Sequence, residues 1–278
     1  MRQIYISTLA VIFTLTTSLA YAAESSKGFK TYPNIVEYKF VSEQAAVPLR
    51  EGVSVIDSRP ARKYDKGHIP VAITISDTLF DDHVDLLPKD KSSLLIFYCG
   101  GLTCPLSHKS AFKAEALGYT NIQVYAAGYP DWVSNGGLPG VSVKYVKKAL
   151  DKGKAVVIDA RPPRKFKKGN VPGSINIPTT RFDDSKGSLP EDKGTELIFY
   201  CGGYQCPLST KGATMAGGLG YTNARVFQAG YPAWEKAYGE KKLSIKEAGE
   251  EGVISISSFM DVLKNHPQDV YLVDVRDQ

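Results

Sequence analysis

The segment LLIFYCGGLTCPLS, residues 94–107, joins an apolar run to a glycine turn and a helix start. The run has the length and composition of a strand buried on both faces of a sheet. Cys99 follows it directly, Gly100 and Gly101 permit a tight loop, and Pro105 suits the first position of a helix. A strand that turns through a short loop into a helix is typical of an α/β fold with a parallel sheet.

The same pattern occurs twice in the chain. The segment ELIFYCGGYQCPLS, residues 196–209, repeats the first at an offset of 102 positions. A period of this length is the size of a small domain, so the sequence predicts a tandem duplication. Other landmarks keep the offset: Asp57 with Asp159, Cys104 with Cys206, Gly128 with Gly230, and Trp132 with Trp234.

The repeat sets the predicted domain boundaries. We expect one domain over residues 34–139 and a second over residues 140–240. A third repeat is predicted to start within residues 253–278, because the final VYLVDVRDQ carries the Asp-x-Arg of the earlier copies at Asp274 and Arg276. Most of a third domain would then be missing, and the sequence would be part of a longer protein.

Each copy alternates apolar strand patterns with helical ones. The helix that starts at Pro105 is expected to extend through Leu117 and to end at Gly118, where a left-handed cap is suitable. The predicted fold class is α/β, with two tandem domains that each have a mainly parallel sheet and helices on both faces. The main strands are expected at 53–58, 94–99, 122–128, 155–160, 197–202 and 224–230.

The N-terminus predicts export. Residues 1–22 combine one basic residue, a long apolar run, and the small residues Ala20 and Ala22, which is the pattern of a signal peptide cleaved near Ala22. Threonines dilute the apolar run, so cleavage is favoured over a retained membrane helix. We therefore expect a periplasmic protein that has no membrane association after cleavage, in a compartment where disulfides can form.

The remaining composition is that of an ordinary globular chain. Hydrophobic residues make up 43% of the sequence, and the formal net charge is +5. The basic residues do not gather into the patch or stripe that nucleic-acid binding requires. No nucleic-acid partner is expected.

The first cysteine of each pair is expected to be nucleophilic. Cys99 and Cys201 should lie at the carboxyl end of a central strand, where α/β proteins place their binding crevices. The two glycines after each cysteine allow backbone N–H groups to turn inward, and the following helix adds partial positive charge. We expect this cradle to lower the pKa of Cys99 from the free value of about 8.5.

The arrangement of motifs around these cysteines resembles the rhodanese (sulfurtransferase) domain. The first copy has a strand that ends in Asp-x-Arg, then YDKGHIPVAITI, the YCGG loop, ALGYTNIQVYAAG, a closing Trp and GLP, and the second copy matches in the same order. The resemblance implies that Cys99 and Cys201 are the catalytic residues, which accept a sulfane sulfur as a persulfide and pass it to an acceptor. It implies these active-site loops: Gly100, Gly101, Leu102, Thr103 and Cys104 in the first copy, and Gly202, Gly203, Tyr204, Gln205 and Cys206 in the second.

The resemblance also sets the expected partners. It implies a sulfurtransferase of the thiosulfate or polysulfide type, with a small sulfur donor (polysulfide, thiosulfate or a persulfide), a thiol acceptor and no cofactor. Neither loop contains a basic side chain, which favours polysulfide or a persulfide over thiosulfate. Tyr204 and Gln205 replace Leu102 and Thr103, so the two sites are expected to differ in donor or acceptor.

The second cysteine of each pair is a candidate resolving thiol. Cys104 and Cys206 precede a proline and are expected at a helix N-cap position. Either thiol could attack the persulfide on its partner, release sulfide and leave a disulfide, which a periplasmic reductant would reset. We expect the resting protein to hold a fraction of each pair, Cys99–Cys104 and Cys201–Cys206, as disulfides.

Other interpretations of the same residues are less specialised. The four cysteines could form structural disulfides, but their repeated strand-loop-helix setting favours reactive thiols, and their spacing is not that of a zinc site, so no metal is expected. Three other functions fit the pairs: thiol–disulfide exchange in the periplasm, a non-catalytic binding module of rhodanese type, and selenium transport. Supporting roles are expected for the following residues: Asp57 with Arg59 and Asp159 with Arg161 as structural ion pairs, His68 as a turn-stabilising group, and Trp132 and Trp234 as core aromatics.

Overall fold

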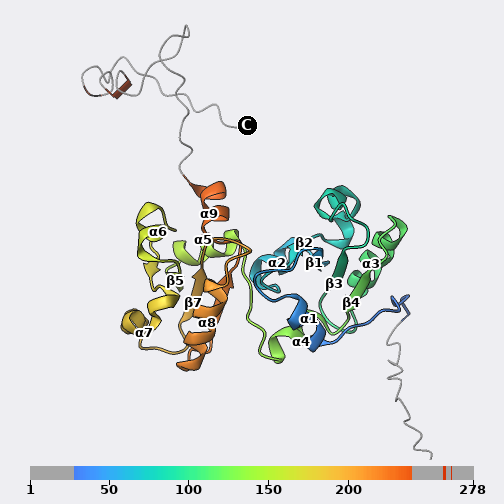
Figure 1. Ribbon diagram of the computed structural model, residues 1–278, viewed down its shortest axis with the longest axis horizontal. Helices are drawn as coiled ribbons and strands as arrows, with labels where there is room; N and C mark the ends of the chain where they lie inside the picture. The colour runs from blue at the N-terminus through green and yellow to red at the C-terminus, as the bar shows by residue number, and fades with distance from the viewer. Residues whose placement is uncertain (1–27, 240–258, 261–263, 265–278) are drawn as a thin grey trace, which may run out of the picture.

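The computed structural model describes residues 28–239 together with residues 259, 260 and 264. The signal peptide predicted for residues 1–22 lies outside the described residues, as does nearly all of the third repeat predicted for 253–278. Figure 1 shows two α/β units, which follow one another along the chain. In the described part of the chain, no helix has the length and hydrophobicity of a membrane span.

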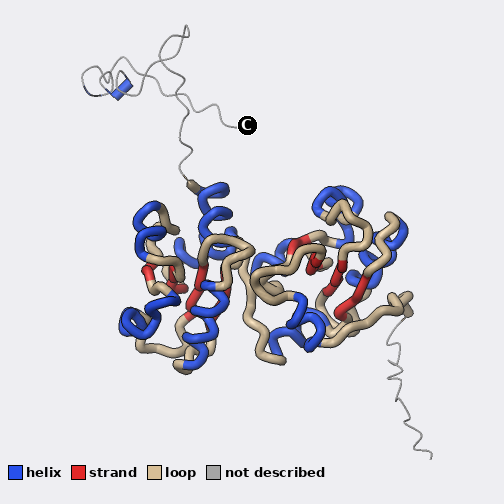
Figure 2. The backbone as a smooth tube through the Cα atoms, viewed as in Figure 1, coloured by secondary structure: helices blue, strands red, loops and turns tan. Residues whose placement is uncertain are grey.

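Each unit is built on a four-stranded sheet in which all strands are parallel, as the sequence predicted (Figure 2). The first sheet has the order β2 (Ile73–Thr74), β1 (Val53–Asp57), β3 (Leu94–Tyr98) and β4 (Ile122–Tyr125). The second has the order β6 (Ile175–Asn176), β5 (Ala155–Asp159), β7 (Glu196–Tyr200) and β8 (Ala224–Phe227). The sequence analysis missed β2 and β6, because two residues are too few to show a period.

Helices cover both faces of the first sheet, because successive strand residues point to opposite sides. Val55, Ile96 and Tyr98 face the side covered by α1 (Tyr38–Gln44), α2 (Ala61–Lys66) and α4 (Gly128–Ser134). Ile56, Leu95 and Phe97 face the side covered by α3 (Leu106–Ala116) and by Phe80, which lies between the 3-10 helices η1 (Asp77–Leu79) and η2 (Asp81–Leu86).

The second sheet repeats this division. Val157, Ile198 and Tyr200 pack toward α5 (Val143–Asp151) and α9 (Gly230–Tyr238). Ile158, Leu197 and Phe199 pack toward α7 (Phe182–Ser185) and α8 (Leu208–Gly218). The remaining elements are α6 (Pro163–Lys168), η3 (Thr179–Arg181) and η4 (Lys186–Ser188). The core positions predicted for Trp132 and Trp234 are confirmed, because both side chains are buried.

The helix after the first cysteine loop differs slightly from its prediction. Gly118 has a φ of +87°, which confirms the left-handed cap. Leu117 lies just beyond the end of α3 and is exposed, so the helix is one residue shorter than expected. Ala111 and Ala114 of α3 are fully buried against the sheet, which holds the start of the helix beside the carboxyl end of β3.

The two units contact each other through the segment that connects them. The backbone of Gly140 exchanges hydrogen bonds with that of His68 in the first unit, at 3.0 and 2.7 Å. The flanking residues pair with Val226 of β8 in the second unit. Arg225 also donates to the carbonyl of Lys66 in α2 at 3.0 Å. These contacts hold the cysteine-bearing end of the second sheet beside α2 of the first unit.

Candidate active site

The structure places Cys99 and Cys201 where the sequence predicted, each directly after the central strand of its sheet. Both side chains are fully buried, and all four cysteines are free thiols. A glycine from the next helix lies against each loop: a Cβ added at Gly128 would be 2.4 Å from the carbonyl oxygen of Cys99, and the same holds for Gly230 and Cys201. These glycines have φ values of +66° and +62°, so a side chain there is excluded by both space and conformation.

The sulfur of Cys99 has two polar contacts in the structure. Its thiol donates to the carbonyl oxygen of Cys104 at 3.1 Å, and the hydroxyl of Ser107 donates to the sulfur at 3.2 Å. Cys201 has the matching contacts with the carbonyl of Cys206 at 3.0 Å and the hydroxyl of Ser209 at 3.2 Å. The sequence analysis did not single out these serines, although their presence in both copies of the repeated segment was an available signal.

The charge of each cysteine pair lies on its second member. The pKa of Cys104 is lowered to about 6, first by a hydrogen bond from Cys99 and further by the N–H groups of Gly100 and Leu106 and the guanidinium of Arg59. The pKa of Cys99 is raised, because its hydrogen bond with Cys104 and its burial outweigh the contribution of Ser107. The prediction that the loop lowers the pKa of Cys99 is therefore wrong for the intact pair.

The second pair behaves in the same way. The pKa of Cys206 is lowered to about 6 by a hydrogen bond from Cys201, by backbone N–H groups and by Arg161. The pKa of Cys201 is raised by that hydrogen bond and by burial. The predicted cradle thus exists in both domains, but it stabilises a thiolate on the outer, half-buried cysteine.

The helix start is displaced by one residue from its prediction. Pro105, rather than Cys104, occupies the N-cap position of α3, and Pro207 does so for α8. Cys104 therefore precedes the cap, yet its sulfur accepts the N–H of Leu106, the first residue of the helix. The second cysteine satisfies a free N–H group at the helix end, as an N-cap side chain does.

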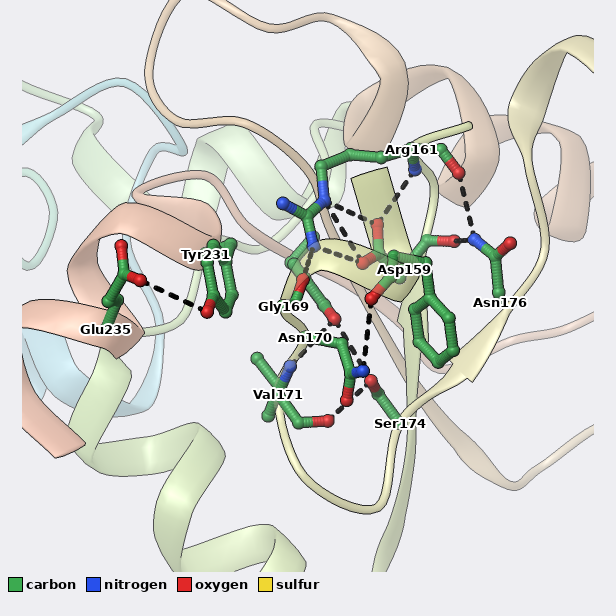
Figure 3. A network of polar contacts seen from close by, with 11 residues as sticks. Asp159, Arg161, Gly169, Asn170, Val171, Ser174, Asn176, Tyr231 and Glu235 are labelled. Carbon is green, nitrogen blue, oxygen red and sulfur yellow. Dashed lines mark hydrogen bonds and ion pairs between the residues drawn. The ribbon is translucent and has the colours of Figure 1, made fainter. Parts of the chain in front are cut away.

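The predicted ion pairs at the ends of β1 and β5 are confirmed. Arg161 donates to both carboxylate oxygens of Asp159, at 2.9 and 2.6 Å, and to the carbonyl of Gly169 at 2.7 Å (Figure 3). Arg59 and Asp57 form the equivalent buried pair. Both arginines also lower the pKa of the second cysteine in their own domain, so the structure gives each loop a nearby positive charge that its sequence lacks.

The predicted turn-stabilising role of His68 is also confirmed. Its Nδ1 atom lies 2.8 Å from the carbonyl oxygen of Tyr64, and its ring stacks on that tyrosine. Burial lowers the pKa of His68 to about 3, so the ring is neutral at neutral pH. Asn170 occupies this place in the second domain and donates to the carbonyl of Phe166 at 3.2 Å.

The assignment of charge predicts the pH dependence of alkylation. We expect iodoacetamide to label Cys104 with a midpoint near its pKa of about 6, because the thiolate is the reactive form. Cys99 should label only at much higher pH. Fragmentation of the alkylated peptide distinguishes the two positions, and a free cysteine peptide provides the control. Equal midpoints for Cys99 and Cys104 would contradict the assignment.

A thiol pair at the carboxyl end of a central parallel strand, beside a helix start, defines an α/β protein built for thiol chemistry. Residues 42–135 and 142–237 each match the Rhodanese-like domain family, and the chain belongs to this family. The tandem rhodanese fold expected from the sequence is thus confirmed. The family supports a sulfurtransferase role in general terms.

Individual relatives are distant and similar in one domain. The human thiosulfate:glutathione sulfurtransferase is 26% identical over 110 residues, which cover 35% of this chain and 94% of the relative. The thiosulfate sulfurtransferase GlpE of Pseudoalteromonas translucida is 26% identical over 102 residues, or 36% of this chain and 92% of the relative. Among solved structures, a thiosulfate sulfurtransferase from Pseudomonas aeruginosa is 18% identical, with 73% of this chain and 42% of that chain covered and a TM-score of 0.34.

Proposed function

We propose that the protein is an exported sulfurtransferase or sulfane-sulfur carrier, in which Cys99 and Cys201 form the persulfides. The observation that carries this proposal is the contact set of each buried sulfur. In both domains a serine hydroxyl lies 3.2 Å from it, and a second thiol with a pKa of about 6 lies in the same loop. A buried sulfur beside an internal base suits a group that accepts sulfur away from water.

Loading begins with a proton transfer inside the pair. The Cys104 thiolate accepts the proton of Cys99, with which it shares a hydrogen bond. The Cys99 thiolate, which Ser107 stabilises by donating to its sulfur, attacks a sulfur atom of a polysulfide chain. A new S–S bond forms on Cys99, an S–S bond of the donor breaks, and the shortened polysulfide leaves as an anion.

The sulfur can leave the persulfide in two ways. An external thiolate that attacks the outer sulfur becomes a persulfide itself and returns Cys99 as a thiolate. Alternatively, the Cys104 thiolate attacks the inner sulfur, expels hydrosulfide and leaves a Cys99–Cys104 disulfide. The second route consumes the dithiol, so a dithiol reductant must restore it before another cycle.

The charge around the loop favours a polysulfide or persulfide donor. The nearest cation in each domain, Arg59 or Arg161, already binds a buried carboxylate in two places. Its guanidinium has little capacity left to orient a thiosulfate dianion. Because the relatives in Homo sapiens and Pseudoalteromonas translucida are named for thiosulfate, thiosulfate is the donor against which polysulfide should be compared.

Export to the periplasm is part of the proposal and rests on residues 1–22. In that compartment thiols are oxidised unless a partner reduces them. A periplasmic reductant is therefore the expected partner of the Cys-x4-Cys pairs.

The test is the mass of the reduced protein after brief incubation with polysulfide. The proposal predicts a gain of one sulfur atom on Cys99 and on Cys201. A thiol–disulfide exchange protein would instead lose two hydrogens per pair, and a non-catalytic binding module would keep its mass. Either of these outcomes would refute the proposal.

The roles of the second cysteines lead to a separate prediction. Replacing Cys104 and Cys206 with serine removes the resolving thiols and retains a group that can accept the helix N–H. The persulfides on Cys99 and Cys201 should then last several-fold longer, and sulfide release should fall. Sulfide release can be followed with a lead or methylene-blue assay. Unchanged release from the double variant would limit the second cysteines to a role as helix caps.

A further inference from the structure

The two cysteine loops differ at one buried position that follows the last strand of each sheet. The second domain has Gln228 after β8, with its side chain fully buried, and the first domain has Ala126 at the equivalent place after β4. The side-chain nitrogen of Gln228 lies within hydrogen-bond distance of three loop carbonyl oxygens. These belong to Gly203 at 3.3 Å, Tyr204 at 3.2 Å and Cys206 at 3.0 Å. Ala126 can make no such bonds, so the first loop lacks this support.

The oxygen of the same amide changes the environment of the catalytic sulfur. It lies 3.1 Å from the hydroxyl of Ser209, which donates to it, and 3.3 Å from the hydroxyl of Thr210. A serine hydroxyl has one proton, so while Ser209 donates to Gln228 it cannot donate to Cys201. In the first domain the hydroxyl of Ser107 has no such competitor and donates to Cys99.

The outer side of the second loop is held as well. The hydroxyl of Tyr204 lies beside that of Tyr64, in α2 of the first unit. Leu102, the equivalent residue of the first loop, is 68% exposed. The second loop is thus fixed by Gln228 from the sheet side and by Tyr64 from the neighbouring unit.

We propose that Gln228 is a positioning residue that clamps the second loop, so that Cys201 and Cys206 close to a disulfide more slowly than Cys99 and Cys104. Together with the proposed function, on which this part rests, the clamp makes the second domain the one that retains its sulfur. The first domain is then the one that releases sulfide readily.

The clamp acts on a step that requires the loop to move. In the structure the thiol of Cys201 donates to the carbonyl of Cys206, a geometry that must change before the two sulfur atoms can bond at about 2.05 Å. During closure the Cys206 thiolate attacks the inner sulfur of the Cys201 persulfide, one S–S bond forms, and hydrosulfide leaves with the electron pair of the broken bond. Moving Cys206 disturbs the bonds from Gln228 to the loop carbonyls, each of which stabilises the open loop.

The test uses the reduced full-length protein and oxidised glutathione, which takes two electrons from each pair and becomes two molecules of glutathione. Trypsin releases each pair on its own peptide, residues 92–109 and residues 194–211, so the two disulfides are counted separately. The first pair should oxidise about tenfold faster than the second, as expected from one or two hydrogen bonds. Equal rates in the wild-type protein would overturn the proposal.

The matched variant is Gln228→Met, which keeps the side-chain volume and removes the amide. It should raise the oxidation rate of the second pair about tenfold and leave the first pair, its internal control, unchanged. It should also move the alkylation midpoint of Cys201 to lower pH, because Ser209 is then free to donate to the sulfur. A merely structural role would not produce this second change. An unchanged second pair in Gln228→Met would refute the clamp.

The two proposals fail separately in these experiments. Oxidation by glutathione disulfide needs no sulfur donor, so the rates test the clamp even if no persulfide ever forms. If the clamp is supported but polysulfide loads neither site, only the proposed function is wrong. If both sites load and then lose their persulfides at the same rate, the assignment of sulfur retention to the second domain is wrong.

Discussion

Replacing both Cys99 and Cys201 with serine will abolish sulfur transfer, whereas either single replacement will leave the other domain competent. Each domain has its own buried sulfur, its own serine hydroxyl at 3.2 Å and its own second thiol. Serine cannot form a persulfide, and a hydroxyl is a poor nucleophile without a strong base. We expect transfer from polysulfide to glutathione to fall on the order of a thousandfold in the double variant.

The single variants provide the control for this experiment. Cys99→Ser should retain loading at Cys201, and Cys201→Ser should retain loading at Cys99, each measured on the tryptic peptide that carries the remaining pair. Loss of both persulfides in one single variant would show that the domains do not act independently. Undiminished transfer in the double variant would show that the sulfur does not pass through these cysteines.

Replacing Asp57 with alanine will destabilise the first domain strongly. The carboxylate is fully buried, accepts two bonds from Arg59 and accepts a third from the hydroxyl of Tyr98 at 2.9 Å. Its removal leaves a buried guanidinium without its counter-charge, which typically costs about 3–5 kcal/mol. Urea unfolding of the full chain should show a transition at a clearly lower urea concentration.

An exposed ion pair supplies the comparison for this measurement. Lys147 and Asp151 pair on the surface of α5, with side chains 42% and 56% exposed. Lys147→Ala should change the free energy of unfolding by at most about 0.5 kcal/mol. If Asp57→Ala and Lys147→Ala had similar effects, the buried pair would not support the strand end as described.

The sheets could be predicted from the sequence because their strands are buried on both faces. LLIFY and ELIFY are continuous apolar runs, and the glycine and proline that follow mark where each chain turns from strand to helix. The 102-residue offset then extended every assignment from one copy to the other. The Asp57–Arg59 pair was predictable for the same reason, since both residues end a buried strand where a charge requires a partner.

The distribution of charge within the cysteine pair could not be predicted in this way. The sequence places two glycines and a helix start near both thiols, but it does not show which sulfur the N–H groups point toward. In the structure Gly100 and Leu106 donate to Cys104, and Cys99 lies deeper, beside a carbonyl oxygen. The direction of each pKa shift depends on these contacts rather than on residue type.

The difference between the two sites was also hidden in the sequence. A glutamine in place of an alanine after an apolar strand is an ordinary variation, and Ala126 and Gln228 have no motif around them that marks a function. Only the fold shows that the glutamine amide reaches three carbonyls of the cysteine loop. The contact with Tyr64 has the same origin, because it depends on how the two units pack.

The most direct test of the central claim follows a single sulfur atom through the protein. The reduced protein is loaded with polysulfide, freed of excess donor and mixed with glutathione, and samples are alkylated at intervals for peptide mass spectrometry. The account predicts one added sulfur on Cys99 and on Cys201 before mixing, followed by its loss at the rate at which glutathione persulfide forms. Formation of glutathione persulfide without any prior sulfur on either cysteine would contradict the account.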